Sequence, residues 1–302
     1  MASEDSVARL MSWGPGRPLA EDAYSRVLAD PNFGRAARAL CAGMADLAEA
    51  DRALDGVFKD AGRYVAALWA MYLHATDGIT LPRLKAVCAS SRLLSPGRAR
   101  AMLIYLQHLG YLAPEPADAD ARPPVRYRPT AVFREAWARH FKVALDAAAL
   151  IEPAAAEVGA AMDQPGMLER FCAHHAHGLL ESARASDHTA PYMAVFMHRH
   201  AGNQIAQTLV LDEDGEGFPS TRPIAINAGA MARRFAVSRI HVRRLLAAAE
   251  REGVLESTAE GVRFTEAARR FVRFNYASQL VQLLSAAAGA LAGAAPEMAR
   301  TG

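Results

Sequence analysis

The sequence predicts a mostly α-helical fold in which one structural unit occurs twice. Alanine accounts for 66 of the 302 residues and aromatic side chains for only 7%, and alanine is the best helix former. Basic residues gather in two stretches, 80–142 with 11 basic and 4 acidic side chains and 226–275 with 10 basic and 5 acidic. These two stretches also resemble each other in sequence, which indicates an internal repeat.

The repeat relates Ser95–Leu112 to Ser238–Leu255 at a constant offset of 143 residues. The identical pairs are Ser95 with Ser238, Arg100 with Arg243, Leu103 with Leu246, Gly110 with Gly253 and Leu112 with Leu255. Similar features follow one another in the same order over about 120 residues in each half. Chance agreement between helices rich in alanine and arginine is the alternative explanation.

Each unit contains the same predicted elements. In the first they are helices over Arg63–Ala75 and Leu81–Ser90, a helix opened by Ser95, two short β-like runs and a helix over Ala131–Leu150. In the second they are Pro191–His200, Ala228–Phe235, a helix opened by Ser238, a hairpin around Ser257–Gly261 and Glu266–Leu291. Serine caps helix starts and glycine helix ends. Helix, turn, helix and hairpin make a winged helix-turn-helix, and we expect two such units in a pseudo-two-fold arrangement.

The expected boundaries follow from this repeat. We predict an N-terminal arm, partly flexible, over 1–30, the first unit over 31–155, the second over 156–292 and a flexible tail over 293–302. Residues 276–295 carry no charge, but their leucines recur at helical spacing, which favours a packing helix over a membrane span. The chain begins without a signal-peptide pattern, and three widely spaced cysteines favour a reducing cytoplasm over a disulfide framework.

The helix opened by Ser238 has two distinct faces. Val242, Leu245 and Leu246 form an apolar stripe, while basic side chains crowd the first two turns. Cations near the N-terminal half of a helix suit docking into the major groove of double-stranded DNA. The first unit repeats this pattern more weakly. The candidate DNA-binding residues are Ser238, Arg239, His241, Arg243, Arg244 and Arg263 in the second unit and Ser95, Arg98, Arg100, Arg126 and Arg128 in the first.

The segment AMARRFAVSRIHVRRLLAAAEREGVL (Ala230–Leu255) resembles the helix-turn-helix of bacterial winged-helix regulators such as the GntR and MarR families. The flanking helices are more similar to those of the MarR family, whose subunits are about half as long as this chain. The resemblance implies a sequence-specific DNA-binding transcriptional regulator that acts as a single-chain pseudo-dimer. Two features depart from the family, a hairpin-like insertion at Asn203–Pro223 and an acidic first wing with Asp118 and Asp120.

Two other function classes stay open. Some plasmid replication initiators also use tandem winged helices, and such units can serve as protein-interaction modules without binding DNA. The sequence contains no P-loop, no GxSxG and no GxGxxG after a strand, so no enzyme and no cofactor are expected. The expected partner is double-stranded DNA, with a small-molecule effector left open and no membrane.

Several residues allow additional chemistry. His174 and His177 share a predicted helix face and, with His188 or His200, could bind a metal ion, but solvated or capping histidines are expected. For Cys88, a small buried hydrophobic side chain is favoured over a redox switch. A further group of aromatic side chains is expected in the core rather than in a ligand pocket, namely Tyr64, Trp69, Tyr72, Tyr192 and Phe196.

Overall fold

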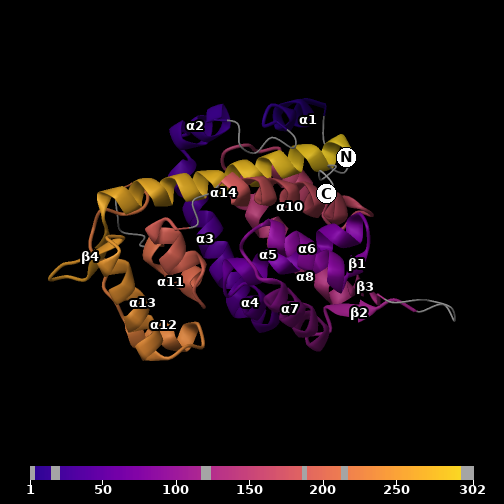
Figure 1. Ribbon diagram of the computed structural model, residues 1–302. Helices are drawn as coiled ribbons and strands as arrows, with labels where there is room; N and C mark the ends of the chain where they lie inside the picture. Colours follow the sequence, from indigo (N-terminus) through magenta and orange to yellow (C-terminus); the bar gives the residue numbers. More distant parts are fainter. Residues whose placement is uncertain (1–3, 15–20, 117–123, 186–188, 212–216, 294–302) are drawn as a thin grey trace.

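The computed structural model describes residues 4–14, 21–116, 124–185, 189–211 and 217–293 (Figure 1). The fold is mostly helical, which confirms the predicted class. The helices up to residue 108 are α1 (Glu4–Met11), α2 (Glu21–Ala29), α3 (Phe33–Ala50), α4 (Arg52–Val57), α5 (Ala61–Ala75), α6 (Leu81–Ser90) and α7 (Pro96–His108). Those that follow are α8 (Ala131–Ala148), α9 (Ala155–Ala160), α10 (Met167–Ala185), the π-helical turn η1 (Met193–Met197), α11 (Gly202–Val210), α12 (Ala228–Arg234), α13 (Arg239–Arg251) and α14 (Glu266–Ala292).

Two small antiparallel sheets complete the described fold. The first contains β1 (Ile79–Thr80), β3 (Arg126–Pro129) and β2 (Leu112–Pro114), in that order across the sheet. The second pairs β4 (Leu255–Ser257) with β5 (Val262–Phe264), and Leu255 lies opposite Phe264. Each sheet therefore includes a hairpin that directly follows α7 or α13. Asp118 and Asp120, expected in the first hairpin, lie outside the described residues.

The two repeated segments have the same order of elements. The series α6, α7, β2, β3, α8 corresponds to α12, α13, β4, β5, α14. The turn between the two short helices contains a left-handed residue in each segment, Arg92 at φ 58° and Ala236 at φ 52°. Both segments thus turn the chain in the same way before their longer helix begins.

Equivalent hydrogen bonds also end the longer helices. Gly110 and Gly253 adopt φ values of 70° and 67°, which favour glycine because it has no Cβ. Their carbonyl oxygens accept hydrogen bonds from the side chains of Thr130 (2.8 Å) and Thr265 (2.7 Å). The same two threonines cap α8 and α14, so one side chain joins the end of one helix to the start of the next.

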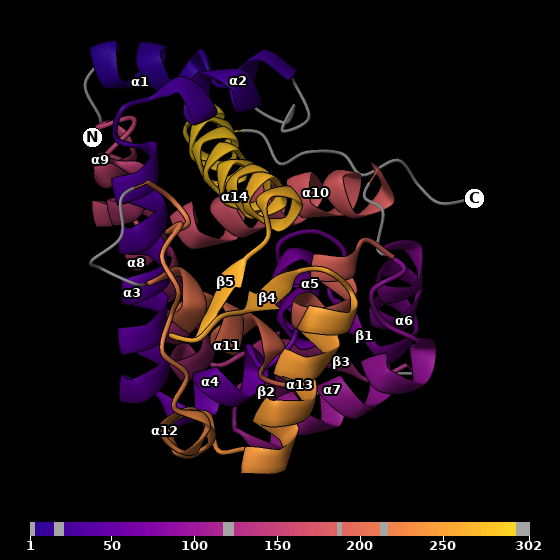
Figure 2. The same ribbon diagram turned by 90° about the vertical axis from the view of Figure 1, so that its left-hand side faces the viewer.

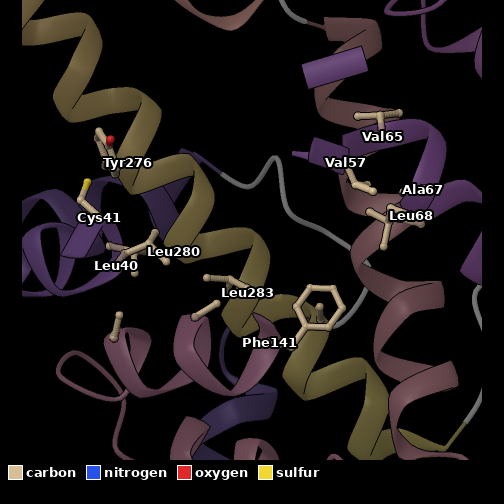
Figure 3. Packing of buried hydrophobic residues seen from close by; sticks show 14 of the residues in the cluster. Leu40, Cys41, Val57, Val65, Ala67, Leu68, Phe141, Tyr276, Leu280 and Leu283 are labelled. Atoms are coloured by element: carbon tan, nitrogen blue, oxygen red, sulfur yellow. The ribbon is translucent and has the colours of Figure 1, made fainter. Parts of the chain in front are cut away.

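The long helix α14 supports much of the core. Its side chain Tyr276 lies beside Cys41 of α3, and Leu280 lies beside Leu40 (Figure 3). Burying an apolar side chain of this size stabilises the fold by about 1.5–3 kcal/mol. The segment expected to be a packing helix is one, and within the described residues no helix is long and apolar enough to cross a membrane.

Two helices connect the halves in a similar way. α3 packs against α8 and also against α11, whereas α10 packs against α14 and also against α5. Because α3 and α10 precede the first and second repeated segments, each contacts the last helix of its own half and an element of the other half. Figure 1 shows α10 and α14 lying along each other above α5 and α8.

The residues expected to form an N-terminal arm include two helices that pack against α14. Leu10 and Trp13 are buried, and the ring of Tyr24 stacks on that of Phe274 with 5.3 Å between centroids. Helices α1 and α2 therefore cover α14 from outside (Figure 2). Of the expected C-terminal tail, residues 294–302 lie outside the described part of the chain.

The prediction of a hairpin-like insertion at Asn203–Pro223 is wrong for the first part of that segment. Residues Gly202–Val210 form α11, in which Ile205, Ala206 and Leu209 are buried. These apolar residues recur at helical spacing and pack toward α3, and this packing outweighs the local turn signals of the segment. Near its end, Ile224 forms a bridge with Val262 of β5.

The expectation of solvated or capping histidines is wrong for the centre of α10. His174 and His175 are buried, and His175 Nε2 lies 3.3 Å from the hydroxyl of Tyr64, which is also 3.3 Å from His140 Nε2. Burial lowers the pKa of His140 to about 3 and that of His175 to about 4. The two imidazoles are therefore neutral and form part of the core. The expected aromatic core residues Trp69, Tyr72, Tyr192 and Phe196 are buried as well.

Acid is expected to destabilise the protein through His140 and His175. In the unfolded chain histidine titrates near 6.5, so below that pH the unfolded state binds protons that the folded state excludes. Stability is complete above about pH 6.5 and declines as the pH falls toward 4, by on the order of 2 kcal/mol per histidine at pH 5. Urea unfolding at several pH values measures this. A His140→Phe/His175→Phe variant is expected to lose this part of the slope, whereas replacing the exposed His108 keeps it; an unchanged slope in the double variant contradicts the assignment.

Candidate nucleic-acid interface

Helix α13 owes its start and its orientation to its own sequence. The Ser238 hydroxyl accepts a hydrogen bond from the backbone N–H of His241 at 3.0 Å and thereby caps the helix. Val242, Leu245 and Leu246 are buried against the rest of the unit, as the apolar stripe predicts. The opposite face of α13 consequently points away from the core.

Three arginines occupy that outward face. Arg239, Arg243 and Arg244 are exposed, and none of them forms an ion pair with a described residue. Arg239 and Arg243, together with Arg233 of α12, line an open hollow of about 590 Å³ between α12 and α13. No carboxylate of the described residues pairs with these arginines, so this surface attracts anions.

Helix α7 presents a weaker version of this surface. Ser95 caps α7 by accepting from the Arg98 N–H at 3.4 Å. The guanidinium of Arg98, however, bonds to the buried carboxylate of Asp60 at 3.1 Å. Arg100 is exposed, without an ion pair to any residue in the described ranges. One of the two α7 arginines is thus already partnered by the protein.

The arginines of the two hairpins also differ in whether they form an ion pair. Arg126 pairs with Glu115 at 3.2 Å, and Arg263 pairs with Glu256 at 2.6 Å across the β4–β5 hairpin. Arg128 is exposed and pairs with no described carboxylate. Because surface pairs of this kind contribute little stability, the two paired arginines can exchange partners at small cost.

The candidate helices lie toward one side of the molecule. Figures 1 and 2 both place α7, α12 and α13 along the lower side, and in Figure 1 α4 lies between α13 and α7. The structure thereby brings the candidate helices of both segments, α7 and α13, to one side. Between the helices lies the segment 58–60 that links α4 to α5, which we call the central junction.

The third residue of each candidate helix contacts the area around the central junction. Arg98 binds Asp60 of the junction, and His241 Nε2 lies 2.8 Å from the carbonyl oxygen of His200. The neighbouring Ala201 N–H donates to the Lys59 carbonyl oxygen at 2.9 Å. A continuous series of contacts therefore joins the N-terminal turn of α7 to that of α13. Burial, followed by the nearby cation Arg63, lowers the pKa of His200.

A buried cluster of polar side chains, Asp55, Lys59 and Gln204, connects α12 to the central junction. Lys59 Nζ lies 2.7 Å from Asp55 Oδ2 and donates to the Phe235 carbonyl oxygen at 3.0 Å. Gln204 of α11 donates from Nε2 to the second oxygen of Asp55. At the surface, Arg234 of α12 pairs with Glu49 of α3 at 2.7 Å. The position of α12 relative to the first half is therefore held by charged and hydrogen-bonded side chains.

Sequence reasoning missed three of these residues. Arg233 belongs to the basic stretch 226–275 but lies in the helix that precedes the candidate helix α13. Asp60 and Lys59 lie outside both basic stretches and become visible only when the chain is folded. The Asp60 side chain does carry a local signal, because it caps α5 by accepting from the Arg63 N–H.

Burial accounts for two of the candidate metal and redox residues, His174 and Cys88. Within the described ranges no group of three or more histidine, cysteine or acidic side chains is arranged to hold a metal ion, and His188 lies outside those ranges. Cys88 is buried, and burial raises the pKa of its thiol to about 12. The expectation that Cys88 is a small buried hydrophobic side chain is confirmed.

The chain was compared with protein-family models, with curated proteins and with solved structures. None of these comparisons gave a match.

Proposed function

We propose that this protein binds double-stranded DNA through two winged helix-turn-helix units and regulates transcription as a single-chain pseudo-dimer. One observation carries the proposal: α7 and α13, the equivalent helices of the two halves, lie toward the same side, and α13 exposes arginines that form no ion pair with any described residue. Free guanidinium groups on an exposed helix suit phosphate oxygens and guanine edges.

The packing of the connecting helices supports the pseudo-two-fold part of the proposal. α3 contacts α8 and α11, and α10 contacts α14 and α5, so each of these helices packs against both halves, which is what a pseudo-dimer within one chain requires. The central junction adds a connection between the N-terminal turns of α7 and α13. The proposed arrangement needs no second chain.

Binding to duplex DNA is expected to weaken steeply with salt, because released counterions drive it. Fluorescence anisotropy with a labelled duplex, repeated at several salt concentrations, measures the slope of log K against log salt. Absence of salt-dependent binding contradicts the proposal. It favours instead a protein-interaction module, for which the carboxylate-paired Arg98, Arg126 and Arg263 are a specific supporting observation.

One chain is expected to occupy one complete binding site. In dimeric regulators of this type two half-sites lie one DNA turn apart, about 34 Å between centres. Sizing the protein on a short duplex at low protein concentration is expected to give a 1:1 complex, with a footprint over about two major-groove turns. An obligate 2:1 complex on a symmetric site contradicts the pseudo-dimer.

A further inference from the structure

Ile240 is an exposed apolar side chain in the middle of a basic surface. It is the second residue of α13, and 60% of it is exposed. Helical spacing places Arg243 and Arg244, three and four residues later, beside it. Among the described residues of α12 and α13 no other large hydrophobic side chain is so exposed. Ile240 therefore presents most of its apolar surface to solvent beside the arginines of α13.

The other residues near the start of α13 are engaged differently. Ser238 uses its hydroxyl to cap the helix, and His241 contacts the carbonyl oxygen of His200. Arg239 lines the hollow shared with α12. Ile240 therefore differs from these three residues: it is exposed in the first turn and takes no part in the helix cap, the contact with His200 or the hollow beside α12.

Thymine is the base that offers an apolar group in the major groove, its C5-methyl. In helix-turn-helix proteins the N-terminal residues of the recognition helix contact the base edges. Resting on the proposed function, we propose that Ile240 selects a thymine in the half-site that α13 occupies, by packing against the C5-methyl group.

The first half lacks this feature. At the repeat offset of 143 residues, Gly97 of α7 corresponds to Ile240. A methyl group added to Gly97 would meet no atom of another part of the protein within 4 Å, so this position of α7 is open and carries no side chain that could pack against a base. The half-site at α7 has no such thymine requirement, and the complete site is asymmetric at this position.

Replacement of thymine by deoxyuridine tests the proposal, because it removes the methyl group and leaves base pairing intact. A bound sequence is first selected from a library of random duplexes, and each thymine of it is then replaced in turn. Wild-type protein is expected to bind about four-fold more weakly when the contacted thymine is replaced, as loss of one buried methyl predicts.

The Ile240→Ala variant is expected to bind the thymine and uracil duplexes equally. Val132→Ala is the matched control, since Val132 is likewise the second residue of its helix, α8, and is 57% exposed; this variant is expected to keep the four-fold preference. Circular dichroism of each variant checks that the fold is retained.

The proposal is overturned if the wild type is indifferent to uracil at every position, or if Ile240→Ala keeps the preference. Both results are obtained on a protein that binds DNA. Failure of the proposed function looks different, because the wild type then shows no salt-dependent affinity for any duplex.

Discussion

Replacing Arg243 and Arg244 together by alanine is expected to weaken duplex binding by more than tenfold. Each specific arginine contact is worth about 1–3 kcal/mol, and both side chains are exposed and unpaired by described carboxylates. Anisotropy titration at fixed salt measures the loss. If the two arginines contact phosphates, the salt slope falls by about 2 as well; if they contact bases, the preference for the selected sequence relaxes.

Two variants make this result specific. Arg251→Ala removes an exposed charge from the last turn of α13, remote from the N-terminal turns, and is expected to change binding little. Arg98→Ala/Arg100→Ala is expected to be less damaging than the α13 pair, because Arg98 is already bound to Asp60. A greater loss in the α7 variant means that the first unit is the main binding surface.

Replacing Lys59 by methionine is expected to destabilise the protein by about 3–5 kcal/mol. The substitution leaves the Asp55 carboxylate buried without its cation and removes the hydrogen bond to the Phe235 carbonyl oxygen. Chemical denaturation followed by circular dichroism measures the change in the free energy of unfolding.

The double variant Asp55→Asn/Lys59→Met is the decisive control. It removes both charges, so no buried ion remains uncompensated, and it is expected to recover most of the lost stability. Since the Lys59 group holds α12 to the central junction, Lys59→Met is also expected to reduce duplex affinity under conditions where the protein is still folded. If Lys59→Met and Asp55→Asn/Lys59→Met have equal free energies of unfolding, the assignment of a stabilising Lys59–Asp55 ion pair is contradicted.

The sequence by itself determined the local structure of both repeated segments. Serine, threonine and glycine at helix ends act through hydrogen bonds within a few residues, so the predicted starts at Ser95 and Ser238 and the ends at Gly110 and Gly253 agree with the structure. The apolar stripe of α13 likewise predicted which face is buried. These features depend on spacing along one helix, which a sequence displays directly.

Only the tertiary structure decided which charged groups remain free. Arg98 and Arg100 look alike in sequence, but Asp60, which neutralises Arg98, lies 38 residues before it in the chain. The contacts of Lys59 with Gln204 and of His241 with His200 span 145 and 41 residues. Likewise, His175 is buried because Tyr64 and α14 pack around α10. Such pairings depend on how distant helices pack, and no local pattern encodes that packing.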